Sequence, residues 1–379
     1  MKVIKVIVFI IMIPLLYLLL NLKSLGKAKK YKGELISGIW YELFPDGLLN
    51  SYGKQSPFFV RKGSENKLMV YFCGGGVSWS EKSAAKPMTI PKMIFSVVTY
   101  YTPKAFFFVR SLMTGILSLN PKNPFKDWNM VFIPYVTGDF YLGNNEFKYK
   151  NGKKTLYHAG ENNTRLLMEE LKKIFPETDI LFICGESAGA FGAAGNASLV
   201  AGYYPDTPVV VYSDASQLVV PLWRKTAEEV WKVNEKMLAK IGEDGDLYYD
   251  LVEYSHSELG DRAVFLRSNT YYDDVLIHFG STLRGGPHTA TPEAIKYFHD
   301  DLIATEEKLE KSGIPYYSFL SSHNKNKKTG LTQHTMCHGE KSFYYKDDVG
   351  ISLSEWLTDA VNGKYQSISE SGQNYGDGK

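Results

Sequence analysis

A serine between two glycines, at the end of an apolar strand, most constrains the fold of this chain. Residues 180–184 are apolar and predict a buried strand, and Gly185, Ser187 and Gly189 follow directly. A helix rich in glycine and alanine is expected over residues 190–201. Small residues on both sides of the serine permit a tight strand-to-helix turn that exposes its hydroxyl. The pattern indicates a nucleophile at Ser187, and a glycine turn that only packs the helix is the competing interpretation.

Strand and helix patterns alternate along the rest of the chain, which predicts an α/β fold. Such alternation is typical of a mostly parallel central sheet with helices on both faces. We expect one domain over residues 31–379, with insertions near 83–120 and 218–262. Both insertions could cap the carboxyl edge of the sheet, or pack as ordinary helices. Further strands are expected at 58–61, 67–73, 129–134, 208–212, 263–267 and 316–320, and helices at 164–174, 227–241, 292–312 and 353–361.

The first 30 residues indicate a targeting segment. Residues 6–20 form an uninterrupted apolar run, with two lysines before it and four after it. As a helix this run would be about 23 Å long, shorter than most membrane spans. It predicts a signal sequence or a signal anchor followed by a basic linker. We expect an anchor because no small-residue cleavage site follows, with the rest of the chain membrane-anchored or secreted, outside the cytoplasm.

Residues at the ends of other predicted strands have the chemistry that a serine nucleophile requires. Gly74, Gly75 and Gly76 end the strand at 67–73. Glycines there let backbone N–H groups approach a substrate oxygen, as an oxyanion hole requires. A flexible glycine turn is the competing interpretation.

A serine nucleophile also needs a base, and the base needs an acid that orients it. His334 lies in the loop after the last long strand, where the base is expected, and His338 stays open as a second candidate. Asp273 and Asp214 each follow a predicted strand, and either could orient an imidazole. Aspartates at strand ends also cap turns and helices, so their position alone leaves the choice between them open.

The composition limits the expected partners and cofactors. The 43 basic and 41 acidic residues leave a net charge of +2, which gives no reason to expect a nucleic acid. Three cysteines are too few for a disulfide framework, and no Cys/His cluster has the spacing of a structural zinc site. A serine nucleophile with a histidine and an acid needs no metal and no organic cofactor, so we expect neither, and we expect a monomer.

Four sequence blocks occur together in a distinctive order. They are YFCGGGVSW at 71–79, NPFKDWN at 123–129, IPYVTGD at 133–139 and GESAG at 185–189. In this order they resemble the pectin acetylesterase/Notum family, and the likeness extends from about Trp40 to about Leu357. The resemblance implies an α/β-hydrolase fold and the hydrolysis of carboxyl esters.

The resemblance also implies roles for individual residues. It assigns the nucleophile to Ser187 and the oxyanion donors to the backbone N–H groups of Gly75, Gly76 and Ala188. The pair Tyr272-Asp273 is similar to the acid motif of the family, and His334-Thr335 is similar to its histidine motif. The resemblance therefore favours Asp273 and His334 over Asp214 and His338, and places Asp214 beside the site.

Together these patterns predict a serine carboxylesterase that removes an O-acyl group, acetyl in our expectation, through a Ser-His-Asp acyl-enzyme mechanism. The expected substrate is an acylated small molecule or polysaccharide. We expect its acyl group on a glycan or another extracellular carrier. Three other functions stay open: an acyltransferase or a lipid-ester hydrolase with the same triad, or a catalytically silent binding protein tethered to a membrane.

Overall fold

The computed structural model describes residues 28–89, 91–92, 98–346 and 350–369. The predicted signal or anchor at 6–20 lies outside these residues. Within the described ranges, no helix has both the length and the apolar character needed to cross a membrane.

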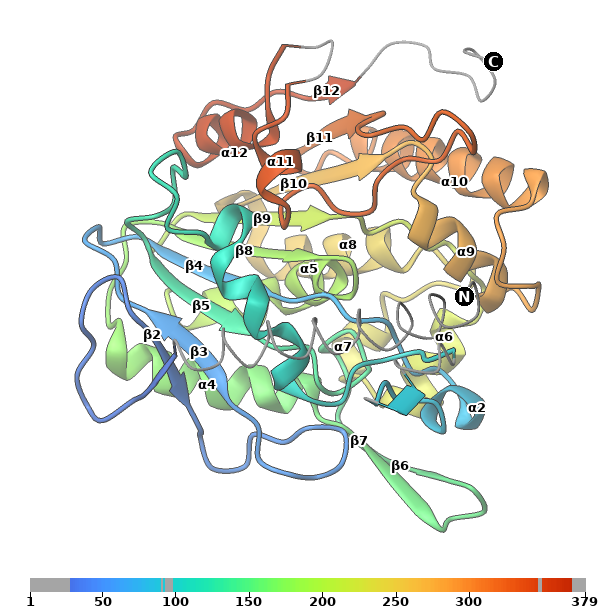
Figure 1. The fold of residues 1–379 in the computed structure, drawn as a ribbon, viewed down its shortest axis with the longest axis horizontal. Helices are drawn as coiled ribbons and strands as arrows, with labels where there is room; N and C mark the ends of the chain where they lie inside the picture. Colours follow the sequence, from blue (N-terminus) through green and yellow to red (C-terminus); the bar gives the residue numbers. More distant parts are fainter. Residues whose placement is uncertain (1–27, 90, 93–97, 347–349, 370–379) are drawn as a thin grey trace, which may run out of the picture.

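A central sheet of ten strands, counted over the described residues, passes through the molecule (Figure 1). Its strand order is β1-β2-β3-β5-β4-β8-β9-β10-β11-β12. All neighbours are parallel except β3, which is antiparallel to both β2 and β5. The strands are β1 Lys29–Lys30, β2 Trp40–Leu43, β3 Phe58–Arg61, β4 Leu68–Phe72, β5 Asn129–Ile133, β8 Leu181–Glu186, β9 Val209–Asp214, β10 Ala263–Thr270, β11 Tyr316–Ser321 and β12 Ile368–Ser369, while β6 Asn145–Tyr149 and β7 Lys154–His158 form a separate hairpin.

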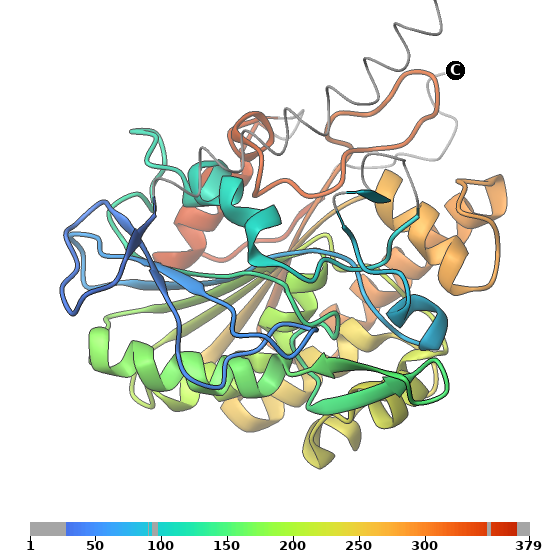
Figure 2. The ribbon, with the colours of Figure 1, turned by 60° about the horizontal axis from the view of Figure 1, so that its bottom comes forward.

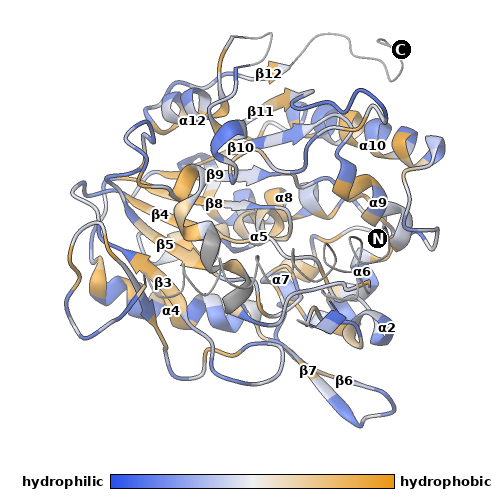
Figure 3. Cartoon of the chain, in the orientation of Figure 1, coloured by the Kyte–Doolittle hydropathy of each residue, from blue (hydrophilic) through white to orange (hydrophobic). Residues whose placement is uncertain are grey.

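Successive side chains of the central strands enter two separate cores. In β4, Val70 and Phe72 pack into one hydrophobic cluster, whereas Met69 and Tyr71 pack into the other. This alternation follows from the two-residue repeat of a strand, whose side chains point to opposite faces. Every residue of β4 and β8 is buried, because both faces of the sheet are covered. Figure 3 shows these apolar strands at the centre, with polar residues toward the outer helices.

The helices form a layer on each face of the sheet (Figure 2). One layer contains α4, α5, α8 and α10, and the other contains η1, η2, α11 and α12. The helical segments are α2 Glu81–Ala84, η1 Ala105–Met113, η2 Gly115–Leu117, α4 Gly160–Ile174, α5 Ala188–Gly202, α6 Trp223–Lys225, the π-helical η3 Thr226–Trp231, α7 Glu235–Leu238, α8 Leu247–Leu259, η4 Gly260–Arg262, α9 Asp274–Leu283, α10 Pro292–Glu310, α11 Glu340–Phe343 and α12 Leu353–Val361. The predicted α/β class, with a mostly parallel sheet and helices on both faces, is confirmed.

One local expectation differs from the structure, and one pair of strands is separated in a way that the sequence analysis did not address. The helix predicted at 227–241 is interrupted, because Lys232 takes the left-handed conformation with φ of 53° and ends η3. The chain then restarts at α7, whose first turn is capped by the Asn234 side chain. The consecutive strands β3 and β4 are also not neighbours, because β5 lies between them and pairs with both.

The two predicted insertions take different positions. The second insertion, near 218–262, contains α8, which packs on α5 and so thickens a helical layer. The first, near 83–120, contains η1 and η2, which lie on the opposite face beside the loop that follows β11. The second insertion also reaches the loop after β4, where the Trp231 indole N–H donates to the Ser78 carbonyl oxygen at 2.7 Å, but it is the first that contacts the histidine loop.

Candidate active site

The turn between β8 and α5 holds Ser187 in a strained conformation. Its φ of 52° and ψ of −121° lie outside the regions that residues with a side chain usually adopt. A Cβ at Gly185 would lie 2.2 Å from the Gly189 carbonyl oxygen, and a Cβ at Gly189 would lie 1.9 Å from that of Phe72. The turn therefore requires glycine at both positions that flank the serine. The Ser187 N–H donates to the Asp214 carbonyl oxygen at 2.7 Å, which fixes the turn to the end of β9.

The three glycines after β4 lie against this turn. A Cβ at Gly74 would be 3.0 Å from the Cβ of Ser187, so the glycine loop and the serine are in direct proximity. Among the turn, loop and cap hydrogen bonds of the described residues, none uses the N–H groups of Gly75, Gly76 or Ala188 as donor. These three groups are thus available to a ligand oxygen. Ala188 begins α5, whose N-terminal end adds positive potential at the same place.

His334 and Asp273, 61 residues apart in sequence, meet at the carboxyl edge of the sheet. The His334 Nδ1–H donates to Asp273 Oδ2 at 2.7 Å. The other carboxylate oxygen of Asp273 accepts from the Leu276 N–H at 2.9 Å and so caps α9. The Asp273 carboxylate is 1% exposed, whereas the His334 ring is 19% exposed. One buried acid therefore caps a helix and fixes the orientation and tautomer of a ring that still reaches the surface.

Asp214, the second candidate acid, holds the backbone of the histidine loop. Its Oδ2 accepts the N–H groups of Met336 at 2.6 Å and Cys337 at 2.8 Å, and its Oδ1 accepts from the Ser268 hydroxyl at 2.7 Å. Between His334 and these donors lies Thr335, in the left-handed region with φ of 57°. The two N–H bonds stabilise this turn. Asp214 therefore connects the serine turn, through its carbonyl oxygen, to the loop that carries His334.

His338, the second candidate base, contacts a different carboxylate. Its Nδ1 lies 3.5 Å from Glu186 Oε1, and its Nε2 lies 3.5 Å from the Ser111 hydroxyl on η1. Neither contact includes Asp273 or Asp214. Glu186 stands directly before Ser187, is buried, and was missed as a site residue by the sequence analysis. Its place next to the serine in the motif was the available signal.

The charge balance around His334 favours its protonated form. Burial lowers the pKa of the imidazole, but the charge and hydrogen bond of Asp273 raise it, and Asp214 and Glu186 add to this. The combined effect raises the pKa above the ordinary value of histidine. Such a base takes up a proton readily, and three carboxylates stabilise the cation that results.

The segment η1 reaches the glycine loop and the histidine loop together. A Cβ at Gly75 would lie 3.0 Å from the ring of Phe108 and 2.7 Å from that of Tyr135. Directly after η1, the Ile116 N–H donates to the Cys337 carbonyl oxygen at 2.9 Å. The aromatic insertion near 83–120 thus places at least one ring, that of Phe108, beside a candidate oxyanion donor.

Two atoms of the candidate triad, the Ser187 hydroxyl oxygen and Nε2 of His334, have no hydrogen-bond partner among the described residues. Within the described residues, no hydrogen bond joins the Ser187 hydroxyl to Nε2 of His334, and neither atom bonds to another side chain. In enzymes without substrate such contacts are often long and tighten on binding. No three His, Cys, Asp or Glu side chains among the described residues lie close enough together to hold a metal ion.

Comparison with known families supports the resemblance noted in the sequence. The pectinacetylesterase family model matches residues 46–220. The resemblance to the pectin acetylesterase/Notum family is confirmed. The match also confirms the predicted class of enzyme, a hydrolase of ester bonds that acts on acyl esters. It includes the glycine loop and Ser187 and ends before Asp273 and His334. The pairing of these last two residues therefore rests on the structure.

A similar fold occurs among solved structures. The crystal structure of the Wnt deacylase Notum from Drosophila matches with a TM-score of 0.61 and 17% sequence identity, over 87% of this chain and 96% of that chain. At this identity the likeness shows the fold alone. No curated protein matches the sequence.

Proposed function

We propose that the protein is a serine carboxylesterase in which Ser187, His334 and Asp273 form the catalytic triad. The observation that carries this proposal is the 2.7 Å contact between His334 Nδ1 and buried Asp273. Asp214 connects the loop that carries His334 to the strained Ser187 turn. A strained serine turn beside an oriented imidazole is the arrangement that acyl transfer requires.

In the proposed mechanism His334 takes the proton from the Ser187 hydroxyl as the oxygen attacks the ester carbonyl carbon. The carbonyl oxygen becomes negative and accepts hydrogen bonds from the N–H groups of Gly75, Gly76 and Ala188. His334 then gives this proton to the departing alcohol, and the acyl group stays bound to Ser187. Water, deprotonated by His334, releases the acid and restores the serine.

The proposed substrate carries a small acyl group, acetyl in the first instance, on a glycan or other carrier outside the cytoplasm. The rings of Phe108 and Tyr135 lie against Gly75, where a Cβ would be 3.0 Å and 2.7 Å from them, and these bulky neighbours of a candidate oxyanion donor support a short acyl group. The family model named for pectinacetylesterase supports an acetylated polysaccharide, and the Notum likeness leaves a protein-bound acyl group as the second candidate.

The nucleophile is tested by Ser187→Ala with p-nitrophenyl acetate as substrate. Loss of the serine of a triad lowers kcat by about four to six orders of magnitude. We expect that loss in a protein that keeps its fold by circular dichroism, whereas Ser64→Ala, at an exposed turn, keeps the activity of the wild type. Near wild-type hydrolysis by folded Ser187→Ala would refute the mechanism, and an inactive wild type would favour a binding protein.

A further inference from the structure

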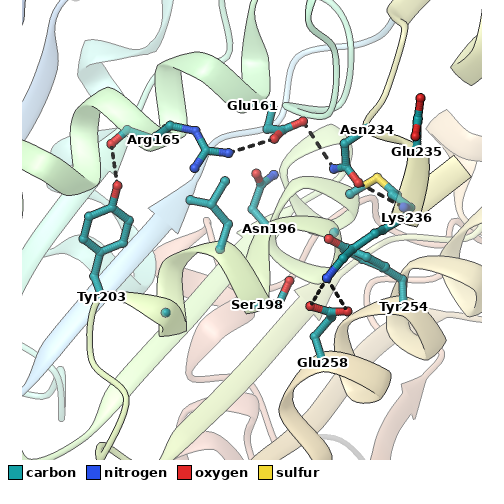
Figure 4. A pocket seen from close by; sticks show the side chains of 14 residues that line it. Glu161, Arg165, Asn196, Ser198, Tyr203, Asn234, Glu235, Lys236, Tyr254 and Glu258 are labelled. Atoms are coloured by element: carbon teal, nitrogen blue, oxygen red, sulfur yellow. Dashed lines mark hydrogen bonds and ion pairs between the residues drawn. The ribbon is translucent and has the colours of Figure 1, made fainter.

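A second pocket lies on a helical layer, away from the serine turn. It is a groove of about 720 Å³ between α4, α5, α7 and α8 (Figure 4). This volume falls within the range of roughly 300–1,000 Å³ that is typical of small-molecule sites. Asn196, one of five residues of α5 that line the groove, comes nine residues after Ser187, about 13 Å along the helix axis. None of the proposed catalytic residues lines the groove, so it is distinct from the ester site.

Two nearly covered side chains present an oxygen to this groove without a protein partner. Asn196 is 1% exposed, and its Nδ2 donates to the carbonyl oxygens of Tyr141 at 3.1 Å and Gly192 at 3.0 Å. These bonds fix the amide so that its own oxygen points away from the backbone, and that oxygen accepts from none of the described residues. Tyr254 is 9% exposed, and its hydroxyl likewise has no partner among the described residues. Both side chains point into the groove in Figure 4.

Polar groups in such positions are normally paired with protein, water or a ligand. The amide oxygen of Asn196 accepts only, whereas the hydroxyl of Tyr254 both donates and accepts. A ligand that pairs with both must therefore carry a donor for the amide oxygen of Asn196 and, beside it, a group that either donates to or accepts from the Tyr254 hydroxyl. Adjacent hydroxyl groups meet that requirement.

The charges at the rim of the groove limit the charge of its ligand. Arg165 pairs with Glu161 at 3.1 Å, and Lys236 pairs with Glu258 at 3.2 Å. Both cations are thus neutralised by partners within the groove, and the remaining carboxylate of Glu235 leaves it with one net negative charge. A carboxylated or phosphorylated ligand would find no unpaired cation there, whereas hydroxyl groups can bond to every one of these side chains.

We infer that this groove binds a neutral, hydroxyl-rich ligand of the size of a short oligosaccharide. Asn196 and Tyr254 contact ligand hydroxyl groups at its base, and the two ion pairs contact hydroxyl groups at its rim. The inference does not depend on the proposed ester chemistry, because the two sites share no residue.

The test measures binding by isothermal titration calorimetry to the wild type and to Ser187→Ala, so that catalysis plays no part. The probes are cellotetraose and galactotetraose, which are neutral, and trigalacturonic acid, which is anionic. We expect saturable binding of a neutral probe, equal in both proteins. Tyr254→Phe keeps the ring, removes the unpaired hydroxyl, and should weaken binding about 3- to 10-fold, as the loss of one hydrogen bond does. Tyr249→Phe, on the same helix but outside the groove, is the matched control and should bind as the wild type does.

Three results would overturn the inference. They are no saturable binding of either neutral probe, tighter binding of trigalacturonic acid than of both neutral probes, or equal affinities of Tyr254→Phe and Tyr249→Phe. Loss of ester hydrolysis in Ser187→Ala with full retention of saccharide binding would support two separate sites. Saccharide binding by a wild type without esterase activity would keep this inference and reject the triad.

Discussion

Asp273 and Asp214 are both buried carboxylates at strand ends, but they contact different parts of the histidine loop. Asp273 bonds the imidazole of His334, whereas Asp214 bonds two backbone N–H groups after it. Burial raises the pKa of Asp214, against the effect of these hydrogen bonds. The sequence could not separate the two residues by position. Asp273 contacts the side chain of the candidate base, whereas Asp214 contacts the backbone of the loop that carries it.

These contacts predict different costs for the two aspartate-to-asparagine substitutions. Asp273→Asn removes the charge that stabilises the imidazolium and should lower kcat for p-nitrophenyl acetate by about 10³- to 10⁴-fold. Asp214→Asn keeps an oxygen that can accept both N–H groups, so it should reduce activity far less and mainly lower thermal stability. A larger loss of kcat in folded Asp214→Asn than in folded Asp273→Asn would assign the acid to β9 instead.

The raised pKa of His334 predicts the acidic limb of the pH profile. The base must be neutral in the free enzyme, so kcat/KM should rise with pH through a midpoint above the ordinary value of histidine. Asp273 is the strongest of the groups that raise this pKa, so Asp273→Asn should move the midpoint to lower pH. A midpoint that is the same in both proteins would show that Asp273 does not face the titrating base.

At the scale of elements, η1 is the segment whose position bears most on the substrate. It lies in the connection between β4 and β5, which is longer than a crossover needs. It contacts the glycine loop through Phe108 and the histidine loop through Ser111. Phe108 packs against both hydrophobic clusters, so its ring lies where the two cores approach the site. This arrangement makes η1 the candidate cap of the acyl pocket.

Shortening the Phe108 side chain should change the preference for acyl length. In Phe108→Ala the space beside Gly75 opens, and hydrolysis of p-nitrophenyl octanoate should rise relative to that of the acetate. The ratio of kcat/KM for the two esters is the measurement, because it is independent of the amount of folded enzyme. Leu112→Ala is the control for loss of packing alone, because Leu112 lies in the same segment but is buried in the hydrophobic cluster that contains Met69 and Tyr71. An unchanged ratio in a folded Phe108→Ala protein would place η1 outside the acyl pocket.

For the molecule as a whole, the candidate active site lies within the described residues, and the targeting segment expected at 6–20 lies outside them. Its expected role and the expected monomer stay predictions. If residues 6–20 act as an anchor, the full chain should sediment with membranes, and a chain that starts at residue 28 should not. Protease added outside intact cells should cleave the full-length protein. Full-length protein with an intact N-terminus in the cytosolic fraction would contradict this location.

Features that depend on neighbouring residues could be predicted from the sequence alone. The serine turn, its flanking glycines, the alternation of strands and helices and the bounds of α12 follow local rules of steric fit and periodicity. The need for Gly185 is local, because a Cβ there would collide with the Gly189 backbone of the same turn, whereas a Cβ at Gly189 would collide with Phe72 on β4, a contact that only the fold creates. The resemblance favoured the same aspartate and histidine that the structure brings into contact, although their spacing in the chain gave no such choice.

How residues distant in the chain are combined could be learned from the folded structure alone. The insertion of β5 between β3 and β4 depends on sheet pairing over about 70 residues, which no local pattern records. The break of the helix expected at 227–241 depends on Lys232 in the left-handed conformation, which a lysine adopts only when its surroundings require it. The division of roles between Asp273 and Asp214, and the groove at Asn196 and Tyr254, depend on which side chains the packing brings together, since burial and hydrogen-bond partners are set by the whole fold.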